Sequence, residues 1–443
     1  MVNYIFKIIC KMEYSLKKSH ERYVALSGKA AFAFFSLIQF VLVIVLWGFP
    51  QFSDQIHHLD LAKQCIREND IYPTLTNLYE EYILAPGLIN LLAVELKIFG
   101  STDIHILVQA VMNIVMALEV FYIGYKIFNK SVGYIAMILF CLLYSNYTSI
   151  AVYGTEIPFT FFALSGFCLV LKDKLWSYFF AASFFFLSVT VRPLVLAFII
   201  ASIVLMVLRK CNWKKYVFLL LPYIFLYVSY GMYNESKVGV FVAQSTTGGR
   251  NFIMSTSEYS DGMTSLGSNL IKDPNSDIGK IQKYTFDTNM TFKERNSYLM
   301  NYSIIWVLHN PFKYLKQMPK KALALFLDDT WPERVMNPIG FNNAWGAART
   351  TSEKAAVLIP MILKNIPYYI IMMFSFGGLW RNRKKMFTEP QLSILSIMIL
   401  MICVTMVVVI IPRYHYPFMF VFEIYAASYI FDCIKKNGLT VKA

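Results

Sequence analysis

Long apolar segments recur along the whole chain and constrain its fold more than any other feature. A helix that crosses the hydrocarbon core of a bilayer needs about 20 mainly apolar residues, and stretches of roughly that kind occur from residue 30 to residue 433. Hydrophobic residues fill 57% of the 443 positions and charged residues only 15%, a balance that excludes a water-soluble domain of this length. Because the segments are spread along the sequence, a single cleavable signal peptide does not explain them.

We therefore predict an all-α polytopic membrane protein with about ten transmembrane helices. The formal net charge of +14 comes from short basic runs between the apolar segments, such as the loop with Arg209 and Lys210. The positive-inside rule places such loops in the cytoplasm, so we assign the charge to membrane orientation and expect no nucleic-acid partner. The expected spans are residues 30–49, 104–127, 131–148, 153–171, 175–191, 193–208, 216–233, 357–380, 391–411 and 417–433.

Both chain ends are basic, so we expect them in the cytoplasm of a multi-pass protein of the plasma or inner membrane. The polar mass then falls on the extracytoplasmic side, in an outer loop at residues 50–103 and in a mixed domain at 234–356. Within that domain, residues 244–290 are rich in Ser, Thr, Gly, Asn and Asp and are expected to be irregular loop, whereas residues 292–327 are expected to form interfacial helices. The predicted plan is, in order, a cytoplasmic N-terminus (1–29), helices one to seven (30–233), the extracytoplasmic domain (234–356), helices eight to ten (357–433) and a cytoplasmic tail (434–443).

Two arginines, Arg192 and Arg413, break the orientation rule because they stand at the outer ends of predicted spans. Either one alone could simply extend its side chain into the lipid headgroups. Two at the same depth, in SVTVRPL and IPRYHYP, favour a shared anionic ligand. Pro193 and Pro417 suit a helix start beside each charge, where free backbone N–H groups also attract an anion.

The first outer loop begins FSDQIHHLDLAKQ and places Asp54 at the membrane surface, directly after the first span. A carboxylate there can reach a ligand whose tail stays in lipid, although it could also serve as an N-cap. His57 and His58 follow at helical spacings of three and four, so a divalent metal site is conceivable, but no third ligand is identifiable. We expect the two histidines to act as hydrogen-bonding neighbours and predict no cofactor.

A second acidic residue, Glu156, stands in YGTEIPF at the outer end of the fourth span and is bordered by apolar sequence. Carboxylates embedded in a membrane are candidates for function. Glu80 and Glu81 lie in the outer loop too, but two adjacent charges in a polar stretch usually form a solvated surface.

These residues resemble the membrane glycosyltransferases of the GT-C class, which use polyprenyl-phosphate sugars, as in the superfamily of protein mannosyltransferases and aminoarabinose transferases. SDQIHHLDLAKQC through YEEYILAPGLINLLAVELKIFG is similar to the family's first outer loop, and YGTEIPFTFF to its threonine-glutamate motif. VRPL and PRYHYP are similar to its two arginine motifs, STTGGRNFI to the opening of its large outer domain, and HNPFKYLKQMPKK to its amphipathic stretch.

The resemblance implies an inverting transfer of a sugar from a polyprenyl-phosphate donor to an extracytoplasmic glycan, lipid or protein. Displacing a lipid phosphate needs a base for the acceptor hydroxyl and cations for the departing phosphate. The residues implied are the base Asp54 with Glu156 orienting acceptor or sugar, then Arg192, Arg413, Lys316 and Lys320 on the donor phosphate, and His57, His58, Glu81, Tyr82, Tyr414 and Arg250 near the substrates.

Two other classes of protein remain open from the sequence. A polymerase or ligase of surface polysaccharide also combines many spans with a large outer loop, but it takes a lipid-diphosphate donor. A transporter or lipid flippase should instead carry its polar residues along a path at mid-bilayer. Here the ionisable residues gather at one face, which favours the transferase.

Overall fold

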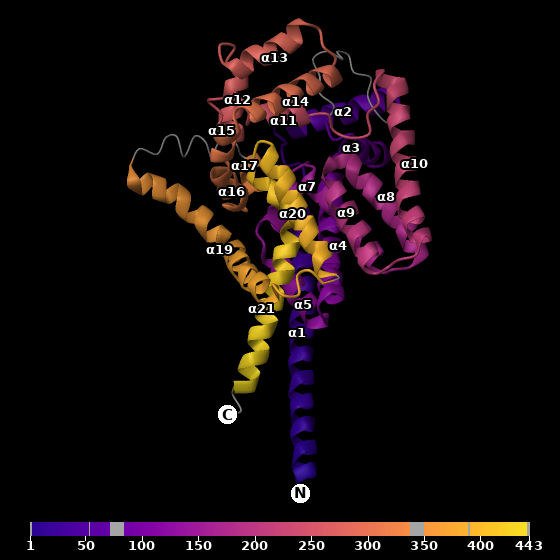
Figure 1. The fold of residues 1–443 in the computed structure, drawn as a ribbon, viewed down its shortest axis with the longest axis vertical. Coiled ribbons are helices and arrows are strands. Elements are labelled where there is room, and N and C mark those ends of the chain that lie inside the picture. The colour runs from indigo at the N-terminus through magenta and orange to yellow at the C-terminus, as the bar shows by residue number, and fades with distance from the viewer. Residues whose placement is uncertain (1, 53, 71–83, 337–349, 389, 441–443) are drawn as a thin grey trace.

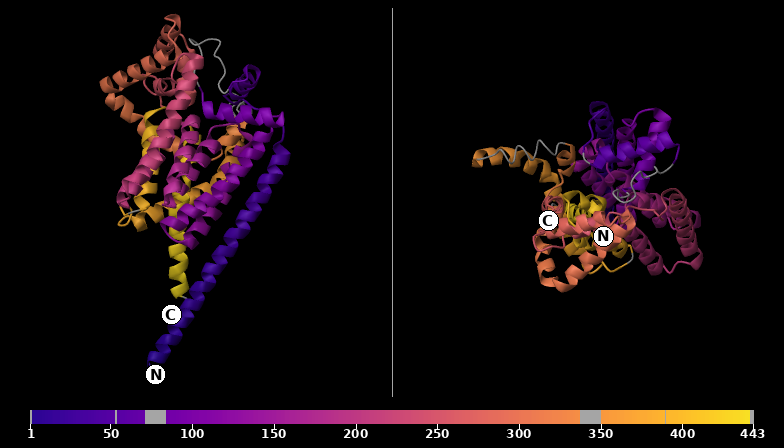
Figure 2. Two further views of the ribbon diagram at one scale, coloured as in Figure 1. Left: turned by 90° about the vertical axis from the view of Figure 1, so that its right-hand side faces the viewer. Right: turned by 90° about the horizontal axis from the view of Figure 1, so that it is seen from above.

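The computed structural model describes residues 2–52, 54–70, 84–336, 350–388 and 390–440. In this part of the chain the secondary structure is helical, and the only β pairing is an isolated bridge between Met263 and Ile410. Figure 1 shows an elongated molecule in which α1 (Val2–Leu46) begins, and α21 (Met419–Thr440) ends, at the same end. A set of short helices covers the opposite end, and Figure 2 shows the same division from the side.

The body is a bundle of apolar helices that pack through their buried faces. Helix α4 (Ile104–Ile127) packs against α5 (Lys130–Leu142) and α7 (Glu156–Leu171), and α8 (Leu175–Val191) packs between α7 and α10 (Trp213–Val238). Helix α21 packs against α5 and α19 (Thr351–Asn382), while α9 (Leu196–Leu208) packs against α20 (Gln391–Val407). The first part of α19 diverges from this bundle (Figure 1).

Within the described residues, five helices are long and apolar enough to cross a bilayer, and a sixth is added if the bent pair Lys130–Leu142 and Ser145–Ala151 forms one span. Four further apolar helices coincide with predicted spans but have at most 17 residues, as in α7, α8 and α20. At 1.5 Å per residue such helices reach about 25 Å, less than the ~30 Å hydrocarbon core. The described chain is an all-α membrane protein, and the count of ten spans stays a prediction.

The short helices α11 to α15, which we call the cap, span residues 244–290, expected to be irregular loop, and part of residues 292–327, expected to be helices. Residues 244–290 contain three helices, so that expectation was wrong. One of the polar residues there acts as a helix cap: Ser276 Oγ accepts a hydrogen bond from Gly279 N at 3.0 Å, at the start of α13. The helices expected over 292–327 are present. The cap helices are α11 (Gly248–Ile253), α12 (Thr264–Lys272), α13 (Asp277–Asp287), α14 (Phe292–His309) and α15 (Pro311–Lys316).

Two short helices lead from the cap back to the bundle, α16 (Met318–Phe326) and α17 (Trp331–Met336). Helix α16 contacts the 3₁₀ helix η3 (Pro412–Phe418), which directly precedes α21. The first outer loop contributes α2 (Asp54–Glu68) and α3 (Pro86–Phe99), which lie at the cap end of the bundle in Figure 1. The cap end therefore collects the start of α2, the start of α7 and η3. The remaining short elements are α6 (Ser145–Thr148), η1 (Ser149–Ala151) and η2 (Pro193–Val195).

Candidate active site

Four side chains from distant parts of the sequence meet at the cap end of the bundle. Asp54 is the first residue of α2 and Glu156 is the first residue of α7. Arg192 lies between α8 and η2, and Arg413 is the second residue of η3. The structure brings together these four residues, which the sequence predicted to lie on one rim of the protein.

Prolines fix the backbone beside both arginines. Arg192 has φ −148° and ψ 138°, an extended conformation that a following proline favours over the helical one. Helix α8 therefore ends at Val191, and Pro193 opens η2 at the position where a missing N–H costs nothing. Pro412 opens η3 in the same way, directly before Arg413. Each arginine thus lies at a helix boundary, where a charge is less costly than at the middle of a membrane helix.

Glu156 lies between the two guanidinium groups. Arg192 Nη2 donates to Glu156 Oε1, and Arg192 Nε donates to Thr155 Oγ1 at 2.6 Å. Arg413 Nε is 3.3 Å from the same Glu156 oxygen, and Arg413 Nη2 is 3.7 Å from Asp54 Oδ2. The contacts form one continuous row from Arg192 through Glu156 and Arg413 to Asp54.

Burial differs sharply along this row. The Glu156 side chain is 1% exposed and the Arg192 and Arg413 side chains are 13% and 17% exposed, whereas the Asp54 side chain is 61% exposed. With all four groups ionised, the two carboxylates and two guanidinium groups have no net charge. A solvent-facing carboxylate beside two largely covered cations can take a proton from an incoming hydroxyl while the cations hold an anion.

Gly154 leaves room for the buried carboxylate. A Cβ atom at this position would lie 2.6 Å from Glu156 Oε2, which is closer than packed atoms approach. That oxygen is buried and makes no hydrogen bond within the described part of the chain. Because residue 154 is a glycine, the Glu156 side chain can pack against the two arginines instead of pointing to solvent.

The residues predicted to contact the substrates differ in their burial and in the side chains that they contact. Tyr414 contacts Arg192, whose guanidinium carbon lies 5.5 Å from the centre of the Tyr414 ring. His58 is buried and hydrogen-bonds the backbone of Tyr153, while His57 is exposed. Burial lowers the pKa of His58 to about 4, with the nearby Asp54 opposing the shift. Among the described residues, no group of three or more His, Cys, Asp or Glu could hold a metal ion.

Other predicted residues lie elsewhere. Lys320 pairs with Asp261 in the loop after α11, and Lys316 is exposed on α15. Neither lysine is in a described contact with the row of four charged residues. Arg250 is exposed on α11, and Glu81 and Tyr82 fall outside the described residues.

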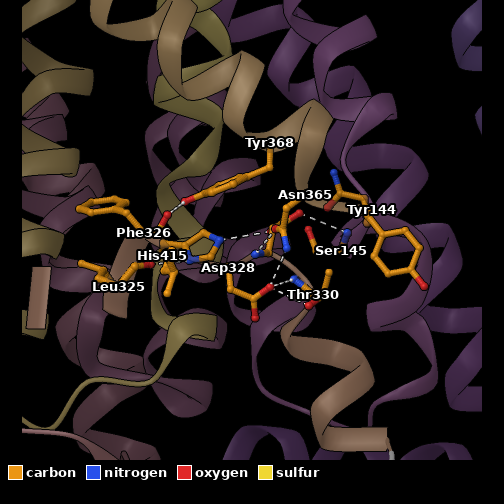
Figure 3. A network of polar contacts seen from close by, with 12 residues as sticks. Tyr144, Ser145, Leu325, Phe326, Asp328, Thr330, Asn365, Tyr368 and His415 are labelled. Atoms are coloured by element: carbon orange, nitrogen blue, oxygen red, sulfur yellow. Dashed lines mark hydrogen bonds and ion pairs between the residues drawn. The ribbon is translucent and has the colours of Figure 1, made fainter. Parts of the chain in front are cut away.

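A buried polar network beside the site was missed by the sequence interpretation. It is built on Asp328, Asp329 and Asn365 and includes His415, only two residues after Arg413 (Figure 3). Its sequence signal was available, because Asp328 and Asp329 are adjacent acidic residues after the apolar run ALALFL. Both aspartates are 1% exposed, so they require partners inside the fold.

No protein-family model matches this sequence, and no curated protein matches it either. The structure is similar to solved structures of the oligosaccharyltransferase of Archaeoglobus fulgidus, a GT-C-class protein. Against its apo form the TM-score is 0.54 with 12% sequence identity, over 94% of this chain and 51% of that chain. Against its complex with an inhibitory peptide and a dolichol-phosphate, the TM-score is 0.52 with 14% identity, over 94% of this chain and 51% of that one.

A third structure of the same archaeal protein is tethered to an acceptor peptide containing the NVT sequon, and has a TM-score of 0.51 with 14% identity over 93% of this chain and 50% of that one. This chain thus spans about half the length of the solved structures it matches. The predicted resemblance is confirmed at the level of the fold. The described part of the chain is an all-α membrane protein with the fold of this archaeal protein, and it carries a row of carboxylates and arginines at the cap end.

Proposed function

We propose that this protein is a membrane glycosyltransferase that transfers a sugar, a hexose or pentose, from a polyprenyl-phosphate donor to an acceptor on the extracytoplasmic side. The row formed by Asp54, Arg413, Glu156 and Arg192 is the observation that carries this proposal. The acceptor is a cell-surface glycan, a lipid or a protein. Support for the donor class comes from the archaeal neighbour that was solved with a dolichol-phosphate.

In this proposal Asp54 is the base. Its carboxylate takes the proton of the acceptor group while the acceptor atom attacks the anomeric carbon of the sugar and inverts its configuration. The bond from that carbon to the phosphate oxygen breaks, and the polyprenyl phosphate leaves with the electron pair. Asp54 suits this role because its side chain is the most exposed of the four, so an acceptor can approach it from solvent.

Arg192 and Arg413 hold the leaving phosphate. The phosphate gains negative charge as the bond breaks, and fixed cations in a poorly hydrated place stabilise that charge more than water does. Arginine fits this role because its planar group can bind two phosphate oxygens together. Glu156 contacts both guanidinium groups, so its role is proposed to be holding them side by side, with the acceptor or sugar bound next to it.

The test is transfer by purified full-length protein in lipid nanodiscs, with synthetic polyprenyl-phosphate sugars as donors. Asp54→Asn should abolish transfer while leaving the affinity for polyprenyl phosphate within about threefold. Asp60→Asn is the matched control, because Asp60 is exposed on the same helix and pairs with the exposed Lys63 at 3.8 Å. Wild-type transfer rates in Asp54→Asn would remove the proposed base.

A polymerase or ligase with a lipid-diphosphate donor is the second candidate. Competition separates the two classes: polyprenyl phosphate should inhibit transfer more strongly than polyprenyl diphosphate if the proposal holds. A lipid flippase would move a fluorescent polyprenyl-phosphate sugar between leaflets without forming any product.

A further inference from the structure

His415 is fully buried, and each of its ring nitrogens faces an oxygen (Figure 3). Nδ1 lies 2.8 Å from the carbonyl oxygen of Leu325, and Nε2 lies 3.2 Å from Asp329 Oδ1. A carbonyl oxygen can only accept, so Nδ1 carries a hydrogen. The contact on the other side then requires one further proton, held either on Nε2 or on the Asp329 carboxyl group, because two lone pairs would otherwise face each other.

Asp329 joins this histidine to two other elements. Its Oδ2 accepts a hydrogen bond from the backbone N–H of Ser145 at 3.3 Å, at the start of α6. Its own backbone N–H donates to Asn365 Oδ1 in α19 at 2.7 Å, and Asn365 Nδ2 donates to Asp328 Oδ1 at 2.8 Å. Asp329 therefore fixes η3 against both α6 and α19 at a single buried point.

The position of this pair beside Arg413 gives it a consequence for the candidate site. A 3₁₀ helix rises about 2 Å per residue, so His415 lies only about 4 Å along η3 from Arg413. Arg413 spans the gap between Glu156 and Asp54 with contacts of 3.3 and 3.7 Å. A displacement of η3 by about 1 Å away from the two carboxylates would lengthen both contacts beyond the roughly 4 Å of a close ion pair.

We propose that Asp329 and His415 form a positioning pair that sets the place of Arg413 and, through it, the place of the donor phosphate. The phosphate role rests on the function proposed above. Neither residue touches the row of four charged residues in the described contacts, so the pair acts through η3. Its effect should appear in donor binding, and the acceptor should be bound as before.

The choice of substitutions distinguishes a positioning carboxyl group from a catalytic one. In Asp329→Asn the amide oxygen can still accept from Ser145 N, and the amide nitrogen can donate to His415 Nε2. In Asp329→Ala both contacts are lost. Tyr368→Phe is the matched control, because it keeps the ring that packs against His415 and removes only the hydroxyl bond to the carbonyl oxygen of Phe326 at 3.0 Å.

The experiment measures the Kd for polyprenyl phosphate, the KM for donor and acceptor, and thermal unfolding, with the full chain in nanodiscs. In Asp329→Ala and His415→Ala the Kd and the donor KM should rise by roughly tenfold or more, with the acceptor KM unchanged. Asp329→Asn should restore both values to within about threefold of wild type, and Tyr368→Phe should match wild type. A general folding defect would instead lower kcat through the active fraction and leave both KM values unchanged.

Two outcomes overturn the pairing. One is a wild-type Kd in both alanine variants, and the other is an Asp329→Asn variant as impaired as Asp329→Ala. His415→Asn keeps a donor for the Leu325 carbonyl and should be impaired by its lost contact with Asp329, which tests the pair even if the alanine variants fail to fold. Failure of the proposed function is distinct, because wild-type protein would then neither bind polyprenyl phosphate nor transfer from it.

Discussion

Arg413 Nη2 lies 3.7 Å from Asp54 Oδ2, although Asp54 lies near the start of the sequence and Arg413 near its end. The same guanidinium group lies 3.3 Å from Glu156. Arg413 therefore connects the exposed carboxylate of the site with the buried one. Arg413 belongs to η3, which is contacted by α7, α16 and α20 and by the network around Asp329. The site therefore depends on how η3 is held.

Removing the buried carboxylate should destabilise the protein. In Glu156→Gln two largely covered guanidinium groups lose their shared counter-charge, and breaking such a pair typically costs about 3 to 5 kcal/mol. We expect thermal unfolding at a lower temperature, and polyprenyl phosphate should raise the Tm of the variant more than that of the wild type, since a phosphate can replace the lost negative charge.

The control for this change is Glu258→Gln. Glu258 pairs with Lys313 at the protein surface, where both side chains are more than half exposed. Such pairs contribute about 0 to 1 kcal/mol, so its Tm should stay near the wild-type value. Equal Tm values for Glu156→Gln and the wild type would contradict the central role given to Glu156.

Replacing Arg413 by lysine should weaken donor binding even though the charge is kept. A lysine has a single ammonium group and cannot bridge two partners as the planar fork does. We expect the Kd for polyprenyl phosphate, measured by titration in nanodiscs, to rise roughly tenfold or more in Arg413→Lys. The control is Arg383→Lys. Arg383 lies just after α19 and its guanidinium group packs over the Trp380 ring, so this variant should bind polyprenyl phosphate like the wild type. Unchanged binding in Arg413→Lys and in Arg413→Ala would exclude Arg413 as a phosphate ligand.

The sequence was sufficient to predict the apolar helices of the bundle and to select four charged residues that the structure brings together. Apolar length defines a membrane helix, and a charged residue at the end of such a helix can only meet others at the same end. Asp54, Glu156, Arg192 and Arg413 were found in this way. The number of spans is harder to predict, because a 16-residue helix such as α7 can tilt, end early or continue through a bent segment.

The parts that were missed depend on tertiary contacts. Asp329 and His415 are 86 positions apart, and no local pattern shows that they meet. In the cap, Ser and Thr residues that look like loop formers serve as helix caps, as Thr291 does for α14 in a reciprocal pair with Glu294. A run of two lysines, Lys320 and Lys321, does not reveal which one turns inward.

Lys321 is the lysine that turns inward, and it should matter more for stability than its neighbour. Its Nζ donates to the carbonyl oxygens of Met406 at 3.1 Å and Val408 at 3.0 Å, at the end of α20. Burial lowers the pKa of Lys321 to about 8. Lys321→Met leaves both buried carbonyl groups without this donor, so we expect a loss of about 2 to 3 kcal/mol in the free energy of unfolding.

Lys320→Met is the control in the same helix, because Lys320 is 55% exposed and pairs with Asp261. Its effect should stay below about 1 kcal/mol. Chemical denaturation in mixed micelles compares the two variants directly. A larger loss in Lys320→Met than in Lys321→Met would show that the capping of α20 by Lys321 is not important for stability.

His58 should make the protein less stable in mild acid. Burial lowers its pKa from 6.5 to about 4 in the folded protein, with Asp54 acting in the opposite direction. Between these two values the unfolded chain binds a proton that the folded chain does not, so the free energy of unfolding rises with pH and is lost as the pH falls from about 6.5 to about 4. Since one pKa unit corresponds to about 1.4 kcal/mol, the loss across this window is on the order of 3 kcal/mol.

The measurement is the Tm between pH 7.5 and pH 4 for wild type, His58→Gln and His57→Gln. His58→Gln removes the titrating group and should flatten the curve in this window, whereas His57→Gln should keep the wild-type slope because His57 is exposed on the same helix. A wild-type slope in His58→Gln would assign the acid sensitivity to other groups.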